Sequence, residues 1–354
     1  MMTVSVVVIN FNGIGDLPAC LESLADQDYP DIELVLVDNC STDGSGELMR
    51  KFAEDPGNRE KFSAGSPRLL LNDTNTGFSP ALNQGIRGSV GELVMPLNTD
   101  VVLDGSFVSR MVAALEGEPS CGSVSGKLLR FPALDRDSII DSTGHLIFRN
   151  RLAENRGEGE VGSTSYLEQC EVFGTCGAAA LYSREMLDDI EVMGEYFDED
   201  FFAFWEDVDV DWRAKIRGWK CVYEPGALAW HRRGGAGYRK SLLVERHNYK
   251  NRLLMIIKND SPRYYLLNLP GIIVTEALKA GAMMVRCPRA LLSLGEVARL
   301  LPKMRAKRRV IQARRTVSAR ELERWFQPFK YRAWIRRHLL NRGEMMTVNE
   351  RAVR

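Results

Sequence analysis

The sequence lacks the cysteine pairs that build zinc sites or disulfide frameworks. It has seven cysteines in 354 residues, an odd number, and none of them forms a CxxC pair. Zinc ribbons and disulfide-stapled scaffolds depend on such regular spacing. We therefore exclude both classes and expect a fold that is held together by its hydrophobic core.

The sequence also lacks a long uninterrupted apolar run. The nearest candidate covers residues 264–285, but it contains Asn268, Pro270, Glu276 and Lys279. Such a segment argues against a simple membrane span and is compatible with a helix lying in the membrane interface. The first residues carry no basic leader or cleavage signal, so we expect a cytosolic, non-secreted protein.

The net charge is zero, but the charges are unevenly distributed. Residues 301–354 hold 16 Lys and Arg against 4 Asp and Glu, whereas the other 300 residues hold 31 against 43. A basic tail on an acidic body fits an anionic partner such as a membrane surface or a nucleic acid. It fits a solvated helical face equally well.

Apolar runs of strand length alternate with helical patterns in the first part of the chain. Strand-like runs cover residues 4–9, 32–37, 68–71 and 92–97, and helical spacing covers residues 16–26, 47–53, 81–86 and 104–115. Continuous apolar strands that alternate with helices are typical of parallel sheets covered on both faces. We therefore predict an α/β fold with a mostly parallel, Rossmann-like sheet flanked by helices.

The pattern becomes less regular after residue 120. Residues 132–170 are rich in Gly, Ser, Asp and Glu and predict surface loops. Residues 177–182 are small and predict a strand close to a ligand. Helical spacing follows over residues 205–218, and residues 219–223 and 227–230 predict two short strands.

The character of the chain changes again near residues 235–245. Helical, basic and amphipathic stretches follow one another from there to the end. We place a domain boundary at this point, with a catalytic domain over residues 1–240 and a basic helical extension over residues 241–354.

Two apolar strands end in polar residues that are suited to binding a ligand. Asp38 closes the run 32–37, and Asn98, Thr99 and Asp100 close the run 92–97. Open α/β sheets bind ligands at the carboxyl ends of their strands, and Mg²⁺ or Mn²⁺ favours carboxylate and phosphate oxygens. The polar residues at each of these strand ends are also explained by an ordinary turn that an Asp or Asn side chain caps.

Further along, Glu206 and Asp207 begin the predicted helix, and His231 follows a short strand. A helix N-terminus favours carboxylates in any protein, and a single histidine is commonly structural. The functional interpretation makes Asp207 a general base and His231 a metal ligand beside Asp100. The pairs Asp209–Arg213 and Asp211–Lys215 have the spacing of surface salt bridges on one helix.

Five sequence blocks together resemble glycosyltransferases of family 2, which have the GT-A fold. The blocks are residues 6–13, 37–45, 75–86, 97–100 and 205–209, followed by His231. They occur in the order of the family and span residues 3–235. More narrowly, the chain resembles rhamnosyltransferase-like bacterial members that build cell-surface polysaccharide, and residues 245–254 are similar to the helix that follows their catalytic region.

The resemblance implies a role for each matching position. Residues 1–105 would hold the nucleotide-sugar and residues 106–240 the acceptor. Asp100 and His231 would bind Mg²⁺ or Mn²⁺, and Asp207 would be the catalytic base. The residues implied in substrate binding are Ile9, Asn10, Phe11, Asp38, Asn75, Gly77, Asn83, Asn98, Thr99, Trp205 and Glu206. The family often has an acidic residue where this chain has Asn98, and the amide at this position implies a lower metal affinity.

The same resemblance implies an inverting transfer by single displacement. The donor would be dTDP-rhamnose or a UDP-sugar, and the acceptor a hydroxyl of a glycan or of a lipid-diphosphate-linked sugar. The amphipathic and basic segments of residues 264–294 and 303–342 would attach the enzyme peripherally to the anionic inner face of the cell membrane.

Three other readings remain open from the sequence. A nucleotidyltransferase is expected to show a Gly-rich basic loop after its first strand, and residues 10–16 contain no Arg or Lys. A catalytically silent scaffold with the same fold would be favoured by loss of Asp100 or Asp207, and both are present. Nucleic-acid binding by the tail is supported by its aromatic and basic residues, but the tail contains no recognised nucleic-acid-binding module.

Overall fold

The computed structural model describes residues 1–62, 67–131, 138–233 and 241–331. Its strands are β1 (Val4–Asn10), β2 (Ile32–Asp38), β3 (Arg68–Leu71), β4 (Leu93–Asn98), β5 (Val101–Leu103), β6 (Cys121–Arg130), β7 (Ile140–Ser142), β8 (His145–Phe148), β9 (Ala153–Asn155), β10 (Cys170–Val172), β11 (Ala180–Ser183), β12 (Lys220–His231) and β13 (Phe326–Gln327). Within these residues, ten strands form one sheet in the order β10-β12-β6-β11-β4-β1-β2-β3, with β5 on β12 and β7 on β6. A smaller sheet has the order β13-β8-β9.

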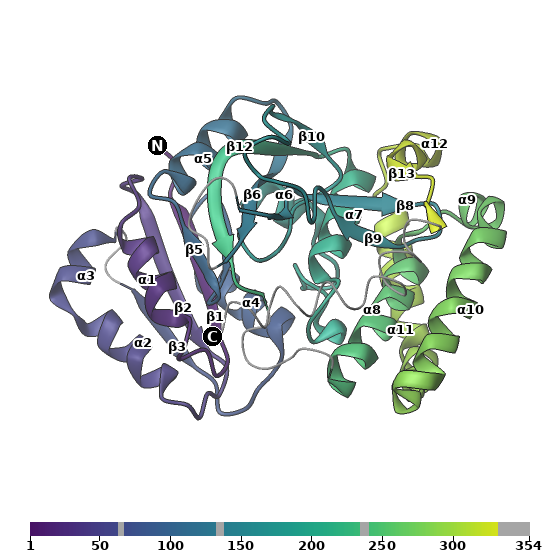
Figure 1. The fold of residues 1–354 in the computed structure, drawn as a ribbon, viewed down its shortest axis with the longest axis horizontal. Helices are drawn as coiled ribbons and strands as arrows, with labels where there is room; N and C mark the ends of the chain where they lie inside the picture. The colour runs from purple at the N-terminus through teal and green to yellow at the C-terminus, as the bar shows by residue number, and fades with distance from the viewer. Residues whose placement is uncertain (63–66, 132–137, 234–240, 332–354) are drawn as a thin grey trace.

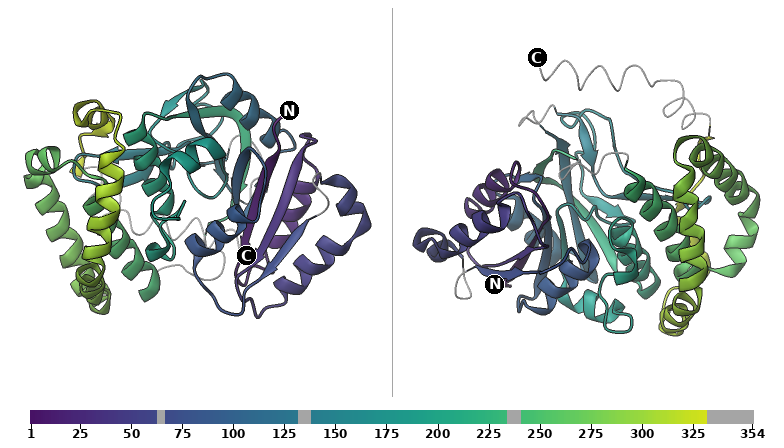
Figure 2. Two further views of the ribbon diagram at one scale, coloured as in Figure 1. Left: turned by 180° about the vertical axis from the view of Figure 1, so that it is seen from behind. Right: turned by 90° about the horizontal axis from the view of Figure 1, so that it is seen from below.

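Helices cover the large sheet and form a group at one end of the molecule. They are α1 (Leu17–Ala25), α2 (Ser45–Glu54), α3 (Pro56–Lys61), α4 (Phe78–Arg87), α5 (Phe107–Glu116), α6 (Arg184–Ile190), α7 (Glu206–Arg217), α8 (Leu242–Asn259), α9 (Pro262–Leu267), α10 (Leu269–Arg286), α11 (Ser293–Ala313) and α12 (Ala319–Leu322), with the 3-10 helices η1 (Glu199–Phe201), η3 (Pro288–Leu292) and η4 (Glu323–Trp325). Figures 1 and 2 show α8 to α11 grouped at the end of the molecule opposite α1 to α3.

Successive side chains of the parallel strands point to opposite faces of the sheet and pack in two different hydrophobic core layers. Val6 and Val8 of β1 pack with residues of α1, α2 and α5. Val7 and Ile9 of the same strand pack with residues of α4, α6 and α7. Because both faces are buried, these strands read as continuous apolar runs, and the predicted α/β architecture is confirmed.

The parallel pairing aligns the carboxyl ends of three strands. β1 pairs with both β2 and β4, and the register places Asn10 beside Asp38 and Ile9 beside Asn98. The polar residues that end these strands therefore meet at one edge of the sheet, where open α/β folds bind their ligands.

The second half of the large sheet is mixed rather than parallel. β11 runs antiparallel to β4 and β6, whereas β6 and β12 are parallel. The prediction of two short strands over residues 219–223 and 227–230 is wrong, because β12 is one strand. Its pairing with β6 shifts register between Tyr223 and Leu228 and then continues, so Pro225 and Gly226 form an irregularity instead of a break.

The prediction of surface loops over residues 132–170 is wrong for residues 138–155, whereas residues 156–169 do form turns and irregular segments. This region contributes β7, β8 and β9, and Asp141, His145 and Arg151 are buried in it. Their charges are paired inside the protein: Arg151, for example, donates to Asp260 at 2.7 Å. The polar composition of this region predicts exposed loops, because the residues that pair with its buried charges lie far away in the sequence and leave no local signal. Residues 132–137 lie outside the described residues.

The C-terminal helices are packed firmly against the rest of the chain. Lys307 of α11 is 1% exposed, and its Nζ donates to Asp198 Oδ1 at 2.6 Å and to Glu195 Oε2 at 2.8 Å. β13 pairs with β8, so the extension also adds a strand to the small sheet. Within the described residues, no helix is both long and apolar enough to cross a membrane.

The two predicted surface pairs on α7 are not surface pairs. Asp209 and Arg213 do interact, at 3.0 Å, but both side chains are buried. Asp211 is paired with His145 instead of Lys215, and Lys215 reaches Glu171 of β10. The i,i+4 spacing identifies only pairs within one helix. In the folded protein, charged residues of other elements can pair with the same side chains.

Candidate active site

A cavity of about 360 Å³ opens at the carboxyl ends of β1 and β4. The predicted site residues in its lining are Ile9, Phe11, Asn75, Gly77, Asn98, Thr99, Asp100, Glu206, Asp207 and His231. The lining also contains Asn39, Phe78, Cys176, Gly177, Ala178, Phe202, Ala203, Phe204, Arg233 and Leu243, which sequence reasoning did not assign as site residues. Segments from the whole length of the predicted catalytic domain thus meet in one space.

Asp38 and Asn10 lie behind the wall of this cavity. The Asp38 side chain accepts hydrogen bonds from Asn10 Nδ2 at 2.7 Å and from the Ser41 amide at 3.0 Å, and Asp38 is 5% exposed. The next residue, Asn39, lines the cavity and accepts from the Thr76 amide at 3.1 Å. Asp38 therefore shapes the loop that carries Asn39, and a direct contact of Asp38 with a nucleotide base remains a prediction.

Asn83 and Trp205 also lie outside the lining. Asn83 is fully buried, and its amide bridges the backbone N–H and C=O of Phe197. Trp205 donates from Nε1 to Asn248 Oδ1 at 3.0 Å and packs on the core. Both residues support the wall of the cavity from behind.

Asp100 and His231 come together because β5 pairs with β12. His231 Nε2 lies 3.3 Å from Asp100 Oδ1, and His231 Nδ1 lies 2.9 Å from Asp141 Oδ2. Burial alone would lower the pKa of His231, but Asp100 and Asp141 raise it to about 10. Metal binding would displace the Nε2 proton, and an imidazole whose Nδ1 is engaged by a carboxylate then presents Nε2 to the ion, beside the carboxylate oxygens of Asp100 that Mg²⁺ or Mn²⁺ prefers.

Arginines flank the same end of β12. Arg233 lines the cavity and pairs with Asp141 Oδ1 at 2.5 Å and with Glu158 at 2.8 Å. Arg232 turns away and pairs with Asp16 at 2.8 Å. Arg233 is therefore the arginine of the two that is positioned to face a phosphate.

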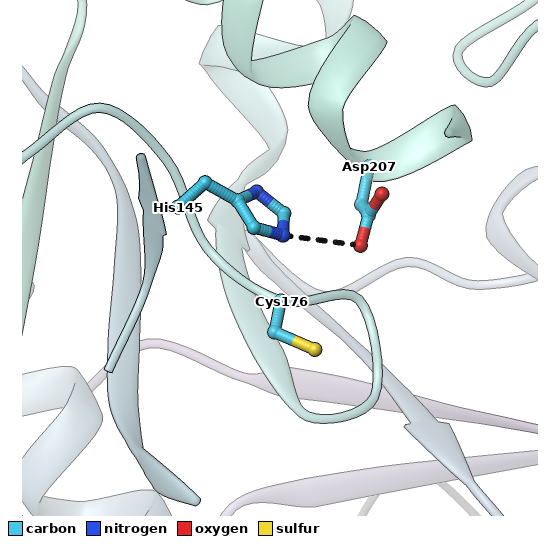
Figure 3. Close-up of side chains that lie close together, drawn as sticks. All are labelled: His145, Cys176 and Asp207. Carbon is cyan, nitrogen blue, oxygen red and sulfur yellow. Dashed lines mark ion pairs between the residues drawn. The ribbon is translucent and has the colours of Figure 1, made fainter. Parts of the chain in front are cut away.

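Asp207 lies in the first turn of α7 and lines the cavity. Its Oδ2 accepts from the Gly177 amide at 3.0 Å and lies 3.6 Å from His145 Nε2, and its Oδ1 accepts from the Val208 amide at 2.8 Å. Figure 3 shows His145 pointing at this carboxylate, with Cys176 alongside. The carboxylate is held in place and still borders the cavity, as a general base requires.

The neighbouring carboxyl group, that of Glu206, is in a different electrostatic state. Its burial, together with the negative charge of Asp207, raises the pKa of Glu206 to about 8. Within the described residues, Glu206 Oε2 is buried without a hydrogen-bond partner. Glu206 is thus a neutral acid at neutral pH, next to the Asp207 carboxyl group.

A strained aromatic loop forms the wall next to α7. Phe202, Phe204 and Trp205 all have positive φ angles, of 69°, 74° and 71°. Asn251 of α8 holds this loop by donating to the carbonyls of Phe201, Ala203 and Phe204, at 2.8–2.9 Å. Backbone strain of this kind persists where surrounding contacts fix it, and it often marks a functional site.

The fold has the arrangement of the GT-A class, and Asp100, His231 and Asp207 face one cavity at the carboxyl edge of its sheet. The sequence profile of glycosyl transferase family 2 matches residues 5–191, more than half of the chain. The protein belongs to this family, as the resemblance in the sequence implied.

Curated relatives are polysaccharide synthases. The chain is 24% identical over 229 residues to poly-beta-1,6-N-acetyl-D-glucosamine synthase of Staphylococcus epidermidis, covering 64% of this chain and 49% of that protein. It is 23% identical over 205 residues to the synthase of the same name from Staphylococcus aureus (strain COL), covering 57% of this chain and 43% of that protein. The chain thus spans about half the length of these relatives.

Solved structures of glycosyltransferases share the fold. S. aureus TarS (residues 1–349) in complex with UDP-GlcNAc has a TM-score of 0.53 at 18% identity, covering 91% of each chain. GalNAc-T7 with UDP, GalNAc and Mn²⁺ has a TM-score of 0.57 at 14% identity, covering 86% of this chain and 58% of that one. The mannosyltransferase PcManGT of Pyrobaculum calidifontis, with GDP-Man and Mn²⁺, has a TM-score of 0.51 at 19% identity, covering 88% and 84%.

Proposed function

We propose that this protein is a metal-dependent, inverting glycosyltransferase. It transfers a sugar from a nucleoside-diphosphate donor to a hydroxyl group of a glycan or a lipid-linked sugar during synthesis of a cell-surface polysaccharide. The observation that carries the proposal is the shared cavity, where the Asp100–His231 pair and Asp207 come from separate elements and face the same space.

Different residues of the cavity have different roles in the proposed reaction. Asp100 and His231 hold Mg²⁺ or Mn²⁺, which stabilises the charge of the leaving nucleoside diphosphate when bound. Arg233 adds a positive charge at the same end of the cavity. Asp207 accepts the proton of the acceptor hydroxyl as that oxygen attacks the anomeric carbon. One displacement with one base inverts the configuration at that carbon.

The donor is a UDP-sugar or dTDP-rhamnose. UDP-GlcNAc bound to TarS and the N-acetylglucosamine polymer in the names of the synthases support a UDP-N-acetylhexosamine. The rhamnosyltransferase-like motifs of the sequence support dTDP-rhamnose. Either donor would place its diphosphate at Asp100 and its sugar toward Gly177 and Asp207.

A panel of donors tests the proposal directly. Calorimetry with UDP-GlcNAc, other UDP-sugars, dTDP-rhamnose and GDP-mannose, each with and without Mn²⁺, should show metal-dependent binding of one donor. Asp207→Asn should retain that binding and lose transfer, and the product of the wild type should have the opposite anomeric configuration to the donor. Absence of binding to every donor would support a silent scaffold, and a product of retained configuration would refute the single displacement.

We also propose that the apolar face of α9 and α10 rests on an anionic membrane surface at the cytoplasmic side. Leu267, Ile273 and Met284 on these helices are 57–65% exposed, and the exposed Arg286 and Arg289 lie at the end of this face. Apolar side chains next to basic ones are typical of interfacial helices. Many basic residues of α11 are not available for lipid: Lys303 and Lys307 are paired with Asp200, and Arg314 with Asp189. Residues 332–342 lie outside the described part of the chain.

Flotation with vesicles that contain anionic lipid tests this attachment. The variant Ile273→Glu/Met284→Glu should remain with the unbound protein, whereas Val90→Glu, at an exposed apolar site outside these helices, should float as the wild type does. Equal flotation of all three proteins would refute the proposed face.

A further inference from the structure

A buried histidine lies directly behind the proposed base. His145 of β8 is 4% exposed, and its Nδ1 lies 2.7 Å from Asp211 Oδ2. On the other side of the ring, Nε2 lies 3.6 Å from Asp207 Oδ2. Asp207 and Asp211 are one turn apart on α7, so both carboxylates face the same imidazole.

The loop over residues 174–177 closes around this arrangement and fixes its geometry. Asp211 Oδ1 accepts from the Thr175 amide at 3.2 Å, and the Gly174 carbonyl accepts from the His145 amide at 2.9 Å. A Cβ atom at Gly174 would lie 1.8 Å from Asp211 Oδ2, so only glycine allows the carboxylate this position. The ring therefore has little freedom to turn away from Asp207.

The groups around the His145 ring are acidic and stabilise its protonated, positively charged form. The groups that face it are Asp207 and Asp211 from α7 and the Cys176 thiol from the loop. Burial alone would lower the pKa of His145, but the two carboxylates and the Cys176 contact raise it well above its usual value. An imidazolium at this position adds a positive charge beside two adjacent carboxyl groups, those of Glu206 and Asp207, that would otherwise compete for one proton.

We propose that His145 is a positioning residue that, as an imidazolium anchored by Asp211, keeps Asp207 ionised and oriented toward the acceptor. This inference rests on the proposed glycosyltransferase function. In the transfer step the acceptor O–H bond breaks and its proton passes to Asp207. The acceptor oxygen then forms the new glycosidic bond, while the bond to the nucleoside diphosphate breaks. His145 keeps its proton throughout.

Nuclear magnetic resonance of the histidine rings tests the charge without any substrate. The chain has four histidines, so the spectrum of His145→Gln assigns the His145 signals in the full-length protein. We expect His145 to remain an imidazolium above neutral pH in the wild type, and its titration midpoint to fall by about one unit or more in Asp211→Asn. A neutral ring at pH 7 in the wild type would refute the proposal.

The pH profile of sugar transfer tests the positioning role. In His145→Gln the acidic limb should move to higher pH, so that kcat/KM falls at least about tenfold more near pH 6 than near pH 8. Donor binding should be unchanged. Tyr182→Phe is the matched control, because it alters a buried side chain near the same carboxylates without removing a charge, and its profile should equal that of the wild type.

The outcomes separate this inference from the proposed function. A loss by the same factor at every pH would indicate a merely structural histidine and would refute the positioning role. If His145→Gln does not fold, Asp211→Asn should show the same shift of the acidic limb, and an unshifted profile would refute the proposal equally. A wild type that transfers no sugar from any donor refutes the proposed function, and the ring spectra then decide the charge of His145 alone.

Discussion

Nε2 of His231 lies 3.3 Å from Oδ1 of Asp100, although one residue follows β4 and the other ends β12. The contact depends on the antiparallel pairing of β5 with β12, which places His231 beside Val101. Asp141 fixes the other ring nitrogen of His231 at 2.9 Å and has no contact with the cavity itself. The two proposed metal ligands are thus positioned by a strand pairing and by a carboxylate behind the histidine.

Asp141→Asn should therefore weaken metal binding without removing a ligand. Carboxylates that orient a metal-binding histidine are commonly worth a factor of 10–100 in affinity, so we expect about that rise in the Mn²⁺ concentration that half-saturates transfer. Asp100→Ala should raise it further, and a chelator should abolish transfer by the wild type. Asp189→Asn, in a surface ion pair with Arg217, is the control and should leave the Mn²⁺ dependence unchanged. Unaltered dependence in Asp141→Asn would contradict the assignment of the pair.

Glu206 makes the stability of the protein depend on pH. Its pKa is raised to about 8 in the folded state, mainly by burial and then by Asp207. Between about pH 4.5 and pH 8 the unfolded chain has lost a proton that the folded protein keeps, so stability falls as the pH rises through this window. Glutamine resembles the neutral acid, and Glu206→Gln should stabilise the protein by roughly 4 kcal/mol near pH 8 and by only about 1 kcal/mol near pH 5.

Urea unfolding at these two pH values measures the effect, with the exposed Glu54→Gln as a control that should change neither value. A difference between Glu206→Gln and the wild type that is the same at both pH values would show that Glu206 is ionised in the folded protein.

Sequence patterns identified the parts of the site that stand at the ends of regular elements. Asp100 follows a strand whose burial on both faces gives a continuous apolar run, and Asp207 begins a helix with clear apolar spacing. Parallel pairing then brings such ends together, so their meeting could be expected from the order of the strands. The family profile covers residues 5–191 and so includes the blocks up to Asp100, whereas residues 205–209 and His231 lie outside the match.

The residues that support the site were missed for a physical reason. Asp141 and His145 lie in short strands without apolar alternation, and their partners, His231 and Asp211, are distant in the sequence. The i,i+4 spacing predicts an Asp211–Lys215 salt bridge because it considers one helix at a time. A buried charge is stabilised by whichever partner the tertiary structure brings closest, and that partner leaves no local signal.

Lys307 should be essential to stability, in contrast to its neighbour Lys303. Both lysines on α11 pair with Asp200 and Glu195, but Lys307 is 1% exposed whereas the Lys303 side chain is 41% exposed. Lys307→Met leaves the buried Asp198 without one of its two cations, and we expect a loss of about 3–5 kcal/mol in the free energy of unfolding. Lys303→Met should cost less than about 1 kcal/mol, as exposed pairs do. Equal effects in chemical denaturation would contradict the buried cluster.

Asn251 is expected to influence catalysis through the loop that it holds. Its side chain donates to three backbone carbonyls of the segment that contains Phe202 and Phe204, two cavity residues with positive φ angles. Asn251→Ala leaves those carbonyls unsatisfied, which should cost about 1–3 kcal/mol of stability and release the strain in the loop. Because the loop runs directly into Glu206 and Asp207, kcat and the KM for the acceptor should worsen, while donor binding by calorimetry stays within about twofold of the wild type. Asn268→Ala removes an asparagine that bonds Tyr264 and Glu323 away from the cavity and should leave both kinetic constants unchanged. Loss of donor binding in Asn251→Ala would instead assign the aromatic loop to the nucleotide-sugar.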